Sequence, residues 1–324
     1  MLQSIFLFAV GLVLLIKGGD WFVDGATGIA KRSNLPDIVV GATVVSIGTT
    51  LPEVMVSTTG ALQGSGAMAY GNAIGSIICN TALIAAISIV CNPGPVNVKS
   101  MKTPAIFFFL SAGLYCLASY VLGTFPRWMG FVMLAIFIDY MITTVISGMK
   151  HPDEAHEESD EERKQRSLLM ELILLVVGAA VIAVGADFLV EHGQIIAIGL
   201  GVPETVVALL FVALGTSLPE LVTTITSLRS GHASLGVGNV IGANVFNLVL
   251  VSGVAVSLAP FDVPCENFLL NTGLNMSLVF EIPVMLGVMA LMIFPTLAKK
   301  KLSRWQGVLL LGIYVAFCIC QFIL

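Results

Sequence analysis

Apolar segments long enough to cross a lipid bilayer follow one another along almost the whole of this chain. A membrane-spanning helix needs about 20 apolar residues, and the 324 residues hold ten such segments with short connections between them. Hydrophobic residues make up 57% of the chain and charged residues only 11%, whereas about 25% of the residues of a soluble domain are charged. The composition excludes a water-soluble globular protein and predicts an all-α membrane protein with ten transmembrane helices.

One strongly charged stretch divides the ten segments into two groups of five. The predicted spans cover residues 2–29, 35–62, 67–91, 103–122, 128–149, 168–198, 202–229, 235–259, 274–297 and 304–323. The stretch 151–167 (HPDEAHEESDEERKQRS) is too polar to bury. We interpret residues 1–150 and 168–324 as two five-helix units and residues 151–167 as an acidic linker. A cation-sensing linker is the alternative, but no EF-hand spacing supports it.

The basic residues predict the orientation of the spans. Thirteen of the 15 lysines and arginines follow spans one, three, five, seven or nine, and only Arg127 lies on the opposite side. Because basic residues concentrate on the cytoplasmic side of membrane proteins, we expect a multi-pass protein of the cell membrane with a cytoplasmic linker. Both termini are then non-cytoplasmic. The first span has no basic residues before it and no cleavage site after it, so we expect it to be retained.

The two units share an internal repeat. A shift of 167 residues aligns GTTLPE at Gly48–Glu53 with GTSLPE at Gly215–Glu220, and GNAIGSIICN at Gly71–Asn80 with GNVIGANVFN at Gly238–Asn247. Since each unit has five spans, the two units have opposite orientations in the membrane. The sequence therefore predicts two inverted five-helix repeats, the plan of many secondary transporters.

Each repeat places one glutamate in the middle of an apolar span. An ionised carboxylate there costs several kcal/mol, so intramembrane acids mark functional sites. Proline precedes both Glu53 and Glu220, and we expect the helix to break there. Such breaks free backbone carbonyls and gather hard oxygen ligands of the kind that Ca²⁺ and Na⁺ take; we expect these carbonyls at Ser46, Thr49, Ala213 and Thr216. The alternative is that the two glutamates serve only packing or helix kinks.

Other polar and small residues receive separate predictions. The motif glycines Gly71, Gly75, Gly238 and Gly242 permit close helix packing, whereas the amides of Asn80 and Asn247 need partners in an apolar setting. Asp139 has no acidic counterpart in the repeat, so we expect it to have a local hydrogen-bonded role. Four repeat-related acids are expected near span ends, where they attract cations or are simply solvated: Asp20, Asp24, Asp187 and Glu191. The six cysteines show no metal-binding spacing and are expected to be buried packing residues.

The duplicated motifs resemble the α-repeats of the calcium/cation antiporter superfamily, specifically its prokaryotic sodium/calcium exchangers, and the likeness covers essentially the whole chain. The resemblance implies ten helices, with spans two, three, seven and eight around an ion site and spans one and six sliding across it. It implies that Glu53, Glu220, Thr49 and Thr216 bind calcium above all. It also implies further sodium ligands or passage-lining groups: the carbonyls of Ser46 and Ala213 and the side chains of Thr50, Ser217, Ser76, Asn80 and Asn247.

The chain departs from the family pattern at a few positions. Asparagine stands at both position 80 and position 247, where members often have one aspartate. Ala243 replaces a common serine, and Ile77 stands where the first repeat often has asparagine. Two central carboxylates remain, while the number of sodium sites is left open.

The predicted function is a secondary antiporter that exchanges Ca²⁺ for Na⁺ at the two-glutamate site, with the lipid bilayer as its setting. The alternative in the same class is a Ca²⁺/H⁺ antiporter, because two protons also neutralise two carboxylates. A passive channel would need a continuous pore, and an intramembrane enzyme has no HExxH or GxSxG motif to support it. We expect no cofactor, no nucleic-acid binding and no obligate protein partner.

Overall fold

The computed structural model is almost entirely helical. It describes residues 2–33, 35–150, 167–199, 215–264 and 275–323. The α-helices are α1 (Leu2–Ser33), α2 (Asp37–Val40), α3 (Ser46–Leu62), α4 (Gly66–Cys79), α5 (Ala86–Cys91), α6 (Val98–Cys116), α7 (Arg127–Met149), α8 (Leu168–Gly199), α10 (Leu218–Arg229), α11 (Ala233–Phe246), α12 (Ser252–Leu258), α13 (Ile282–Lys299) and α14 (Arg304–Ile323). Within these ranges, nine helical stretches are long and apolar enough to cross a membrane. The remaining predicted span, 202–229, falls partly outside the described residues.

Short π-helical turns interrupt several spans. They are η1 (Gly41–Val45), η2 (Asn80–Ala85), η3 (Leu117–Leu122), η5 (Asn247–Val251) and η7 (Ser277–Glu281). Two of them, η2 and η5, begin at the repeat-related residues Asn80 and Asn247. Single π-helical turns are rare and frequently occur at functional sites.

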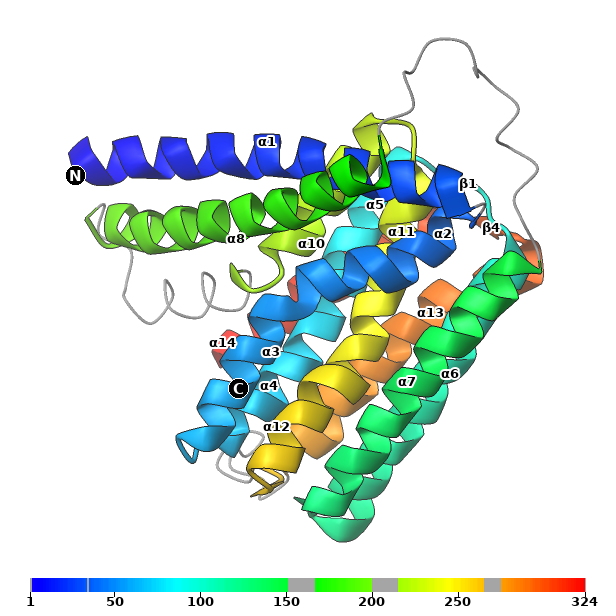
Figure 1. The fold of residues 1–324 in the computed structure, drawn as a ribbon. Helices are drawn as coiled ribbons and strands as arrows, with labels where there is room; N and C mark the ends of the chain where they lie inside the picture. Colours follow the sequence, from blue (N-terminus) through cyan, green and yellow to red (C-terminus); the bar gives the residue numbers. More distant parts are fainter. Residues whose placement is uncertain (1, 34, 151–166, 200–214, 265–274, 324) are drawn as a thin grey trace.

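Helices α1 and α8 form a separate pair that crosses the other helices at a steep angle (Figure 1). The two helices are antiparallel, and glycines let their backbones touch. A Cβ atom on Gly11 would lie 2.9 Å from the Gly185 carbonyl oxygen, and one on Gly178 would lie 2.6 Å from the Phe22 backbone nitrogen. Such close contact is typical of small residues at membrane helix interfaces.

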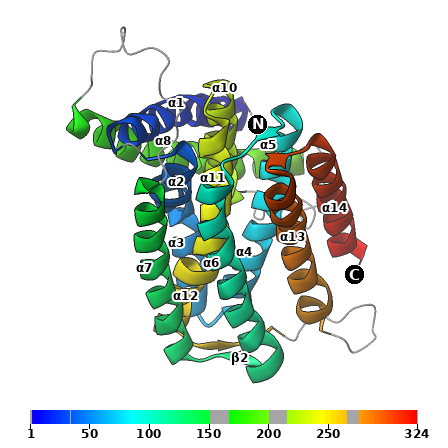
Figure 2. The ribbon, with the colours of Figure 1, turned by 90° about the vertical axis from the view of Figure 1, so that its right-hand side faces the viewer.

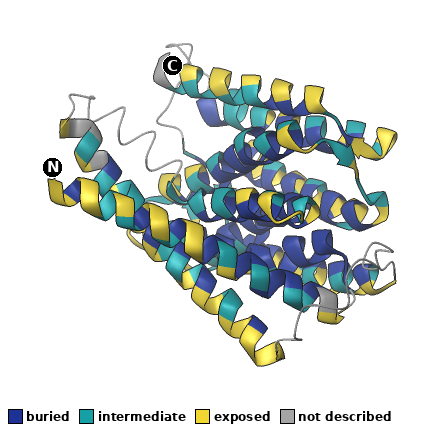
Figure 3. Ribbon diagram, turned by 90° about the horizontal axis from the view of Figure 1, so that it is seen from above, coloured by how far each residue is buried: buried dark blue, intermediate teal, exposed yellow. Residues whose placement is uncertain are grey.

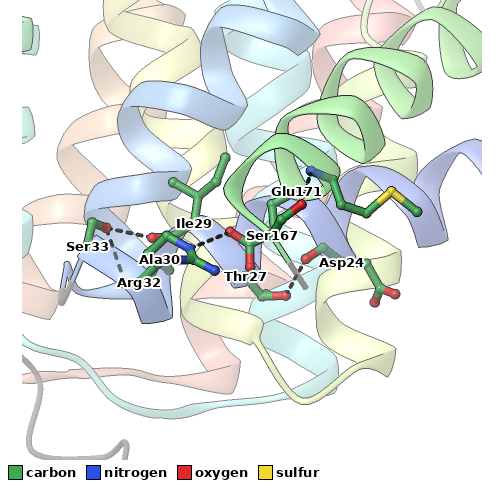
Figure 4. Close-up of polar contacts among 9 residues, drawn as sticks. Asp24, Thr27, Ile29, Ala30, Arg32, Ser33, Ser167 and Glu171 are labelled. Carbon is green, nitrogen blue, oxygen red and sulfur yellow. Dashed lines mark hydrogen bonds and ion pairs between the residues drawn. The ribbon is translucent and has the colours of Figure 1, made fainter. Parts of the chain in front are cut away.

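An ion pair joins the same two helices at one end. Arg32 Nε lies 3.2 Å from Glu171 Oε2, so the last turn of α1 is connected to the first turn of α8 (Figure 4). The glycine contacts and this ion pair together make α1 and α8 one packed unit.

The remaining helices form a compact bundle beside this pair. Helices α13 and α14 lie at one side of the bundle and α7 and α12 at the other (Figure 2). Viewed from above, buried residues fill the centre of the bundle and exposed ones lie on its periphery (Figure 3). Exposed residues of the outer helices include Val121, Phe131, Ile138 and Val308, as expected for faces that contact lipid.

Two short antiparallel ribbons each join the first half of the chain to the second. Strand β1 (Gly94–Pro95) pairs with β4 (Lys301–Leu302), and β2 (Thr124–Phe125) pairs with β3 (Phe261–Asp262). Strands β1 and β3 stand at equivalent positions of the 167-residue repeat. The halves are therefore connected by the same kind of contact at two places.

The structure corrects three of the predictions from the sequence. Pro52 lies inside the continuous helix α3, since membrane helices tolerate proline where neighbouring groups satisfy the freed backbone carbonyl. In the second half the helix α10 does begin beside the corresponding proline, since it starts at Leu218 and has Pro219 in its first turn. Among the described cysteines only Cys79 is buried. Cys91 is exposed, since it lies in the last turn of α5, and Cys116, Cys318 and Cys320 are half-buried. Cys265 lies outside the described residues.

The third correction concerns two of the four repeat-related acids. Asp20 and Asp187 lie well inside α1 and α8, which have 32 residues each. Asp24 and Glu191 lie closer to the ends of the membrane-spanning stretches, which finish at Ala30 and Gly193. Asp139 accepts a hydrogen bond from Thr143 Oγ1 at 3.1 Å, which agrees with the local role expected for it. The linker 151–167 lies outside the described residues except for Ser167.

Candidate ion site

Two carboxylates lie in the interior of the bundle. Glu53 is on α3, in the turns that follow the π-helical turn η1, and Glu220 is in the first turn of α10. Both residues have 0% exposure. Neither oxygen of either carboxylate has a hydrogen-bond partner among the described residues. The two carboxylates are close enough for their charges to interact. A cation is the natural partner for such a pair, because two buried like charges repel each other.

The threonine of each repeat motif donates a hydrogen bond to an asparagine of the other repeat. Thr49 Oγ1 donates to Asn239 Oδ1 at 3.1 Å, and Thr216 Oγ1 donates to Asn72 Oδ1 at 3.4 Å. The 167-residue shift converts one of these pairs into the other. Each hydroxyl therefore directs its proton to an asparagine, which leaves its oxygen lone pairs available to a cation.

Asn72 and Asn239 also hold the neighbouring groups. Asn72 Nδ2 donates to Ser57 Oγ at 2.8 Å and to the Glu53 carbonyl oxygen at 3.3 Å. Ser46 Oγ lies 2.9 Å from the Asn239 carbonyl oxygen and 2.8 Å from that of Gly41. Sequence reasoning did not select these two asparagines, although both belong to the duplicated GN dipeptide. The signal that could have found them was the constant repeat offset.

Most of the other predicted site residues are buried. Thr50, Ser217, Asn80 and Asn247 have side-chain polar atoms without hydrogen-bond partners among the described residues. Ser46 and Ser76 are buried, and Thr216 is half-buried. Ala213 lies outside the described residues. The described members of this set thus place polar oxygen and amide groups in the interior of the bundle.

A second polar cluster adjoins α11. Asn244 Nδ2 donates to Thr81 Oγ1 at 2.7 Å and lies 3.1 Å from Met289 Sδ, while its Oδ1 has no partner among the described groups. Asn244 was not selected from the sequence because its repeat counterpart is Ile77. No sequence signal distinguishes it.

A cavity of about 1110 Å³ separates α8 from α3. Its lining is mostly apolar, but it reaches Thr216 and includes Asp187 and Glu191 of α8. Met55 of α3 and Ala186 of α8 both line it. Their repeat counterparts, Val222 of α10 and Gly19 of α1, are instead packed together, since a Cβ on Gly19 would lie 2.7 Å from Val222 Cγ1. The α1–α10 contact is therefore closed at the position where the corresponding α8–α3 contact leaves a cavity.

The motif glycines of the second half allow α11 to touch the turns before Ser46. A Cβ on Gly242 would lie 2.4 Å from Ser46 Oγ and 2.6 Å from the Ala42 backbone, and one on Gly238 would lie 2.2 Å from the Ile38 carbonyl oxygen. These two glycines therefore have the packing role considered for them, whereas a Cβ on Gly71 or Gly75 would meet no described atom within 4 Å. No cluster of three or more His, Cys, Asp or Glu side chains occurs in the described ranges. The candidate site consists of one pair of carboxylates together with hydroxyl and amide groups.

Known proteins are similar to this chain over nearly its whole length. A family model described as "Sodium/calcium exchanger protein" matches residues 3–146 and 170–323. The chain is 31% identical over 353 residues to the sodium/calcium exchanger MaX1 of Methanosarcina acetivorans, with 97% of each chain covered. It is also 34% identical over 266 residues to the putative antiporter CaxA of Alkalimonas amylolytica, covering 80% of this chain and 82% of that one.

Solved structures show the same similarity. The sodium-calcium exchanger NCX_Mj, soaked with Na⁺ and Sr²⁺, has a TM-score of 0.79 and 29% sequence identity, with 97% of each chain covered. The similarity thus extends over both halves of the molecule.

Proposed function

Because this chain belongs to the sodium/calcium exchanger protein family, we propose that it is a secondary antiporter exchanging Ca²⁺ for Na⁺ across the cell membrane. In this proposal Glu53 and Glu220 form the transport site, and Ca²⁺ and Na⁺ occupy it in turn. The observation that carries the proposal is the pair of wholly buried carboxylates on repeat-related helices.

Charge balance explains why such a site would exchange ions. Two ionised carboxylates carry a charge that one Ca²⁺ or two Na⁺ neutralises, and an unneutralised pair is costly to move past apolar surfaces. Such a site can change its accessibility only with ions bound, and it binds either Ca²⁺ or Na⁺ at one time. The two ion flows are therefore coupled.

The proposed ligands are the glutamate carboxylates together with the hydroxyls of Thr49 and Thr216. The hydrogen bonds of these hydroxyls to Asn239 and Asn72 support this assignment, because they leave oxygen lone pairs for the ion. Further sodium ligands or passage-lining groups are the carbonyls of Ser46 and Ala213 and the side chains of Thr50, Ser217, Ser76, Asn80 and Asn247.

Alternating access is the mechanism we propose. The cavity between α3 and α8, with its closed counterpart between α1 and α10, supports it. Exchange of these two arrangements by movement of the α1–α8 unit would expose the site to each side of the membrane in turn. The inverted repeat makes the two arrangements equivalent by construction.

The Ca²⁺/H⁺ alternative rests on one observation. Asn80 and Asn247 are uncharged, so two protons suffice to neutralise the buried acids. The test is ⁴⁵Ca²⁺ uptake into proteoliposomes with outward gradients of Na⁺, K⁺ or H⁺ imposed separately. Uptake driven by Na⁺ at clamped pH supports the proposal, and uptake driven only by H⁺ replaces it with the alternative. A current carried by single channels would contradict both.

A further inference from the structure

Four basic side chains gather at the loop between α13 and α14. Lys299, Lys300, Lys301 and Arg304 line a cavity of about 630 Å³, together with residues 93–95 and the neighbouring Leu302 and Ser303. No carboxylate lines this cavity, so its positive charges have no acidic partner among the described residues around it. An anionic ligand would satisfy them.

The loop holds a lysine in a backbone conformation that normally favours glycine. Lys300 ends α13 in the left-handed region, with φ 53° and ψ 27°, and it is the one non-glycine residue with positive φ in the described part of the chain. Helices that end in this conformation usually carry glycine there. The Lys300 carbonyl accepts a hydrogen bond from the Val96 N–H at 3.1 Å, so the β1–β4 ribbon holds the lysine in place.

The basic side chains on either side of Lys300 also have contacts that fix their positions. Arg304 Nε donates to the Val90 carbonyl oxygen at 3.0 Å, which leaves the remaining guanidinium donors available. Lys299 Nζ lies 5.6 Å from the centroid of the Trp305 ring. The basic groups therefore surround the cavity from ordered positions.

An exposed apolar surface continues from the basic cavity. Phe294 of α13 and Trp305, Val308 and Leu309 of α14 are exposed. Tryptophan is enriched at the boundary between lipid headgroups and acyl chains, and clusters of lysine and arginine beside membrane helices bind anionic lipid headgroups. A ligand with a phosphate group and apolar chains fits both parts of this surface.

We propose that this cavity, lined by Lys299–Lys301 and Arg304, binds the headgroup of an anionic phospholipid whose acyl chains lie against α13 and α14. The site is separate from the proposed ion site. The site recognises two parts of its ligand together, the phosphodiester group and the apolar chains.

The test uses quenching of Trp305 fluorescence in the full-length chain. The double substitution Trp21→Phe/Trp128→Phe leaves Trp305 as the remaining tryptophan. The protein is placed in phosphatidylcholine nanodiscs that contain either phosphatidylglycerol or phosphatidylcholine with brominated acyl chains, at equal mole fractions. We expect brominated phosphatidylglycerol to quench Trp305 at a lower mole fraction than brominated phosphatidylcholine.

Two variants of the cavity should weaken that preference. Lys300→Gly and Lys301→Gln should each lower the apparent affinity for brominated phosphatidylglycerol by about fivefold, because one basic residue near the surface contributes about 1 kcal/mol. Lys300→Gly should not lower the unfolding midpoint, since glycine favours the left-handed conformation. The matched control is Lys99→Gln/Lys102→Gln, which removes two exposed charges of α6 outside the cavity lining and should keep the preference.

Several outcomes would overturn the proposal. Equal quenching by the two brominated lipids would show that the cavity does not select an anionic headgroup. An equal loss in the α6 control would show a general attraction of charge. Displacement by millimolar inorganic phosphate would assign the cavity to a free anion, and a preference seen only after the acids of 151–167 are neutralised would assign it to that segment.

Discussion

Glu53 and Glu220 differ from the other described carboxylates in being wholly buried without a basic partner. The next most buried acids are Asp37 and Glu171, and these face His232 at 2.7 Å and Arg32 at 3.2 Å. Buried acids that serve structure are normally paired in this way. The two glutamates lack such a partner among the described groups, which supports a mobile cation as their counterpart.

Replacing either glutamate by glutamine should abolish calcium exchange while the protein stays folded and inserted. Glutamine keeps the shape of the side chain but removes half of the central negative charge, so a bound Ca²⁺ would carry an uncompensated charge in a low-dielectric site. That penalty is several kcal/mol, and each 1.4 kcal/mol changes affinity about tenfold. The measurement is ⁴⁵Ca²⁺ exchange at matched expression.

The matched control for this pair is Asp139→Asn. Asp139 lies in a span but is exposed and bonded to Thr143, so its replacement should leave exchange near normal. Because the repeat relates the two glutamates, Glu53→Gln and Glu220→Gln should reduce exchange by comparable factors. Near-normal exchange in either variant would disprove the proposed site.

Asn247→Asp should preserve calcium transport but shift its pH dependence. A third carboxylate beside Glu53 and Glu220 adds like charge, which favours protonation of the group. The pH at which exchange is half-maximal should therefore move upward. Exchange measured from pH 5 to pH 9 checks this, and a profile that overlays that of the parent would mean that position 247 does not sense the central charge.

At the scale of helices, the π-helical turn η1 is tied to a neighbouring helix just before the predicted site residue Ser46. The turn η1 precedes Ser46, and its Ala42 carbonyl accepts a hydrogen bond from Tyr140 of α7 at 2.7 Å. Tyr140 is wholly buried against Phe107 and Phe246. The RWMG run at residues 127–130 recurs as RWQG at residues 304–307, which aligns Tyr140 with Phe317, a residue without a hydroxyl to donate.

Tyr140→Phe should remove this support without creating a cavity. Loss of one hydrogen bond costs about 1 kcal/mol, so the unfolding midpoint should fall slightly. If the turn positions Ser46 for ion binding, the apparent affinity for Ca²⁺ should fall by about fivefold. Unchanged affinity with a lowered unfolding midpoint would restrict Tyr140 to stability.

The contact of α11 with η1 leaves no room for a methyl group at Gly242. Gly242→Ala would push against Ser46 Oγ and the Ala42 backbone, and overpacking of this kind costs about 1–3 kcal/mol. We expect a lower unfolding midpoint in detergent and reduced exchange. Gly113→Ala is the control, because no described atom lies within 4 Å of the added Cβ; similar effects of the two changes would refute the packing argument.

At the scale of the molecule, we propose that the acidic linker is cytoplasmic and dispensable for exchange. Its composition gives it nothing to bury, and it lies on the basic-rich side of the predicted topology. Shortening residues 151–166 should leave ⁴⁵Ca²⁺ exchange unchanged. A cysteine placed by Ser159→Cys should be labelled from the cytoplasm, and labelling from outside intact cells would contradict the topology.

The linear order of the residues was enough to predict the helical segments and the position of the two glutamates. The observed spans begin and end within a few residues of those expected, as for 66–91 against 67–91. Span length and hydrophobicity are properties of consecutive residues, so no knowledge of neighbours is needed. The repeat offset is likewise a property of the sequence, and it aligned Glu53 with Glu220 directly.

Tertiary structure decided which groups meet. The Thr49–Asn239 hydrogen bond joins residues 190 positions apart, and hydropathy does not say which spans are neighbours. Pro52 stays within a continuous helix, and a cavity lies between α3 and α8 although Gly19 of α1 and Val222 of α10 are packed together. A sequence repeat shows which contacts correspond, but only packing decides which of them leaves a cavity, because packing depends on residues far apart in the chain.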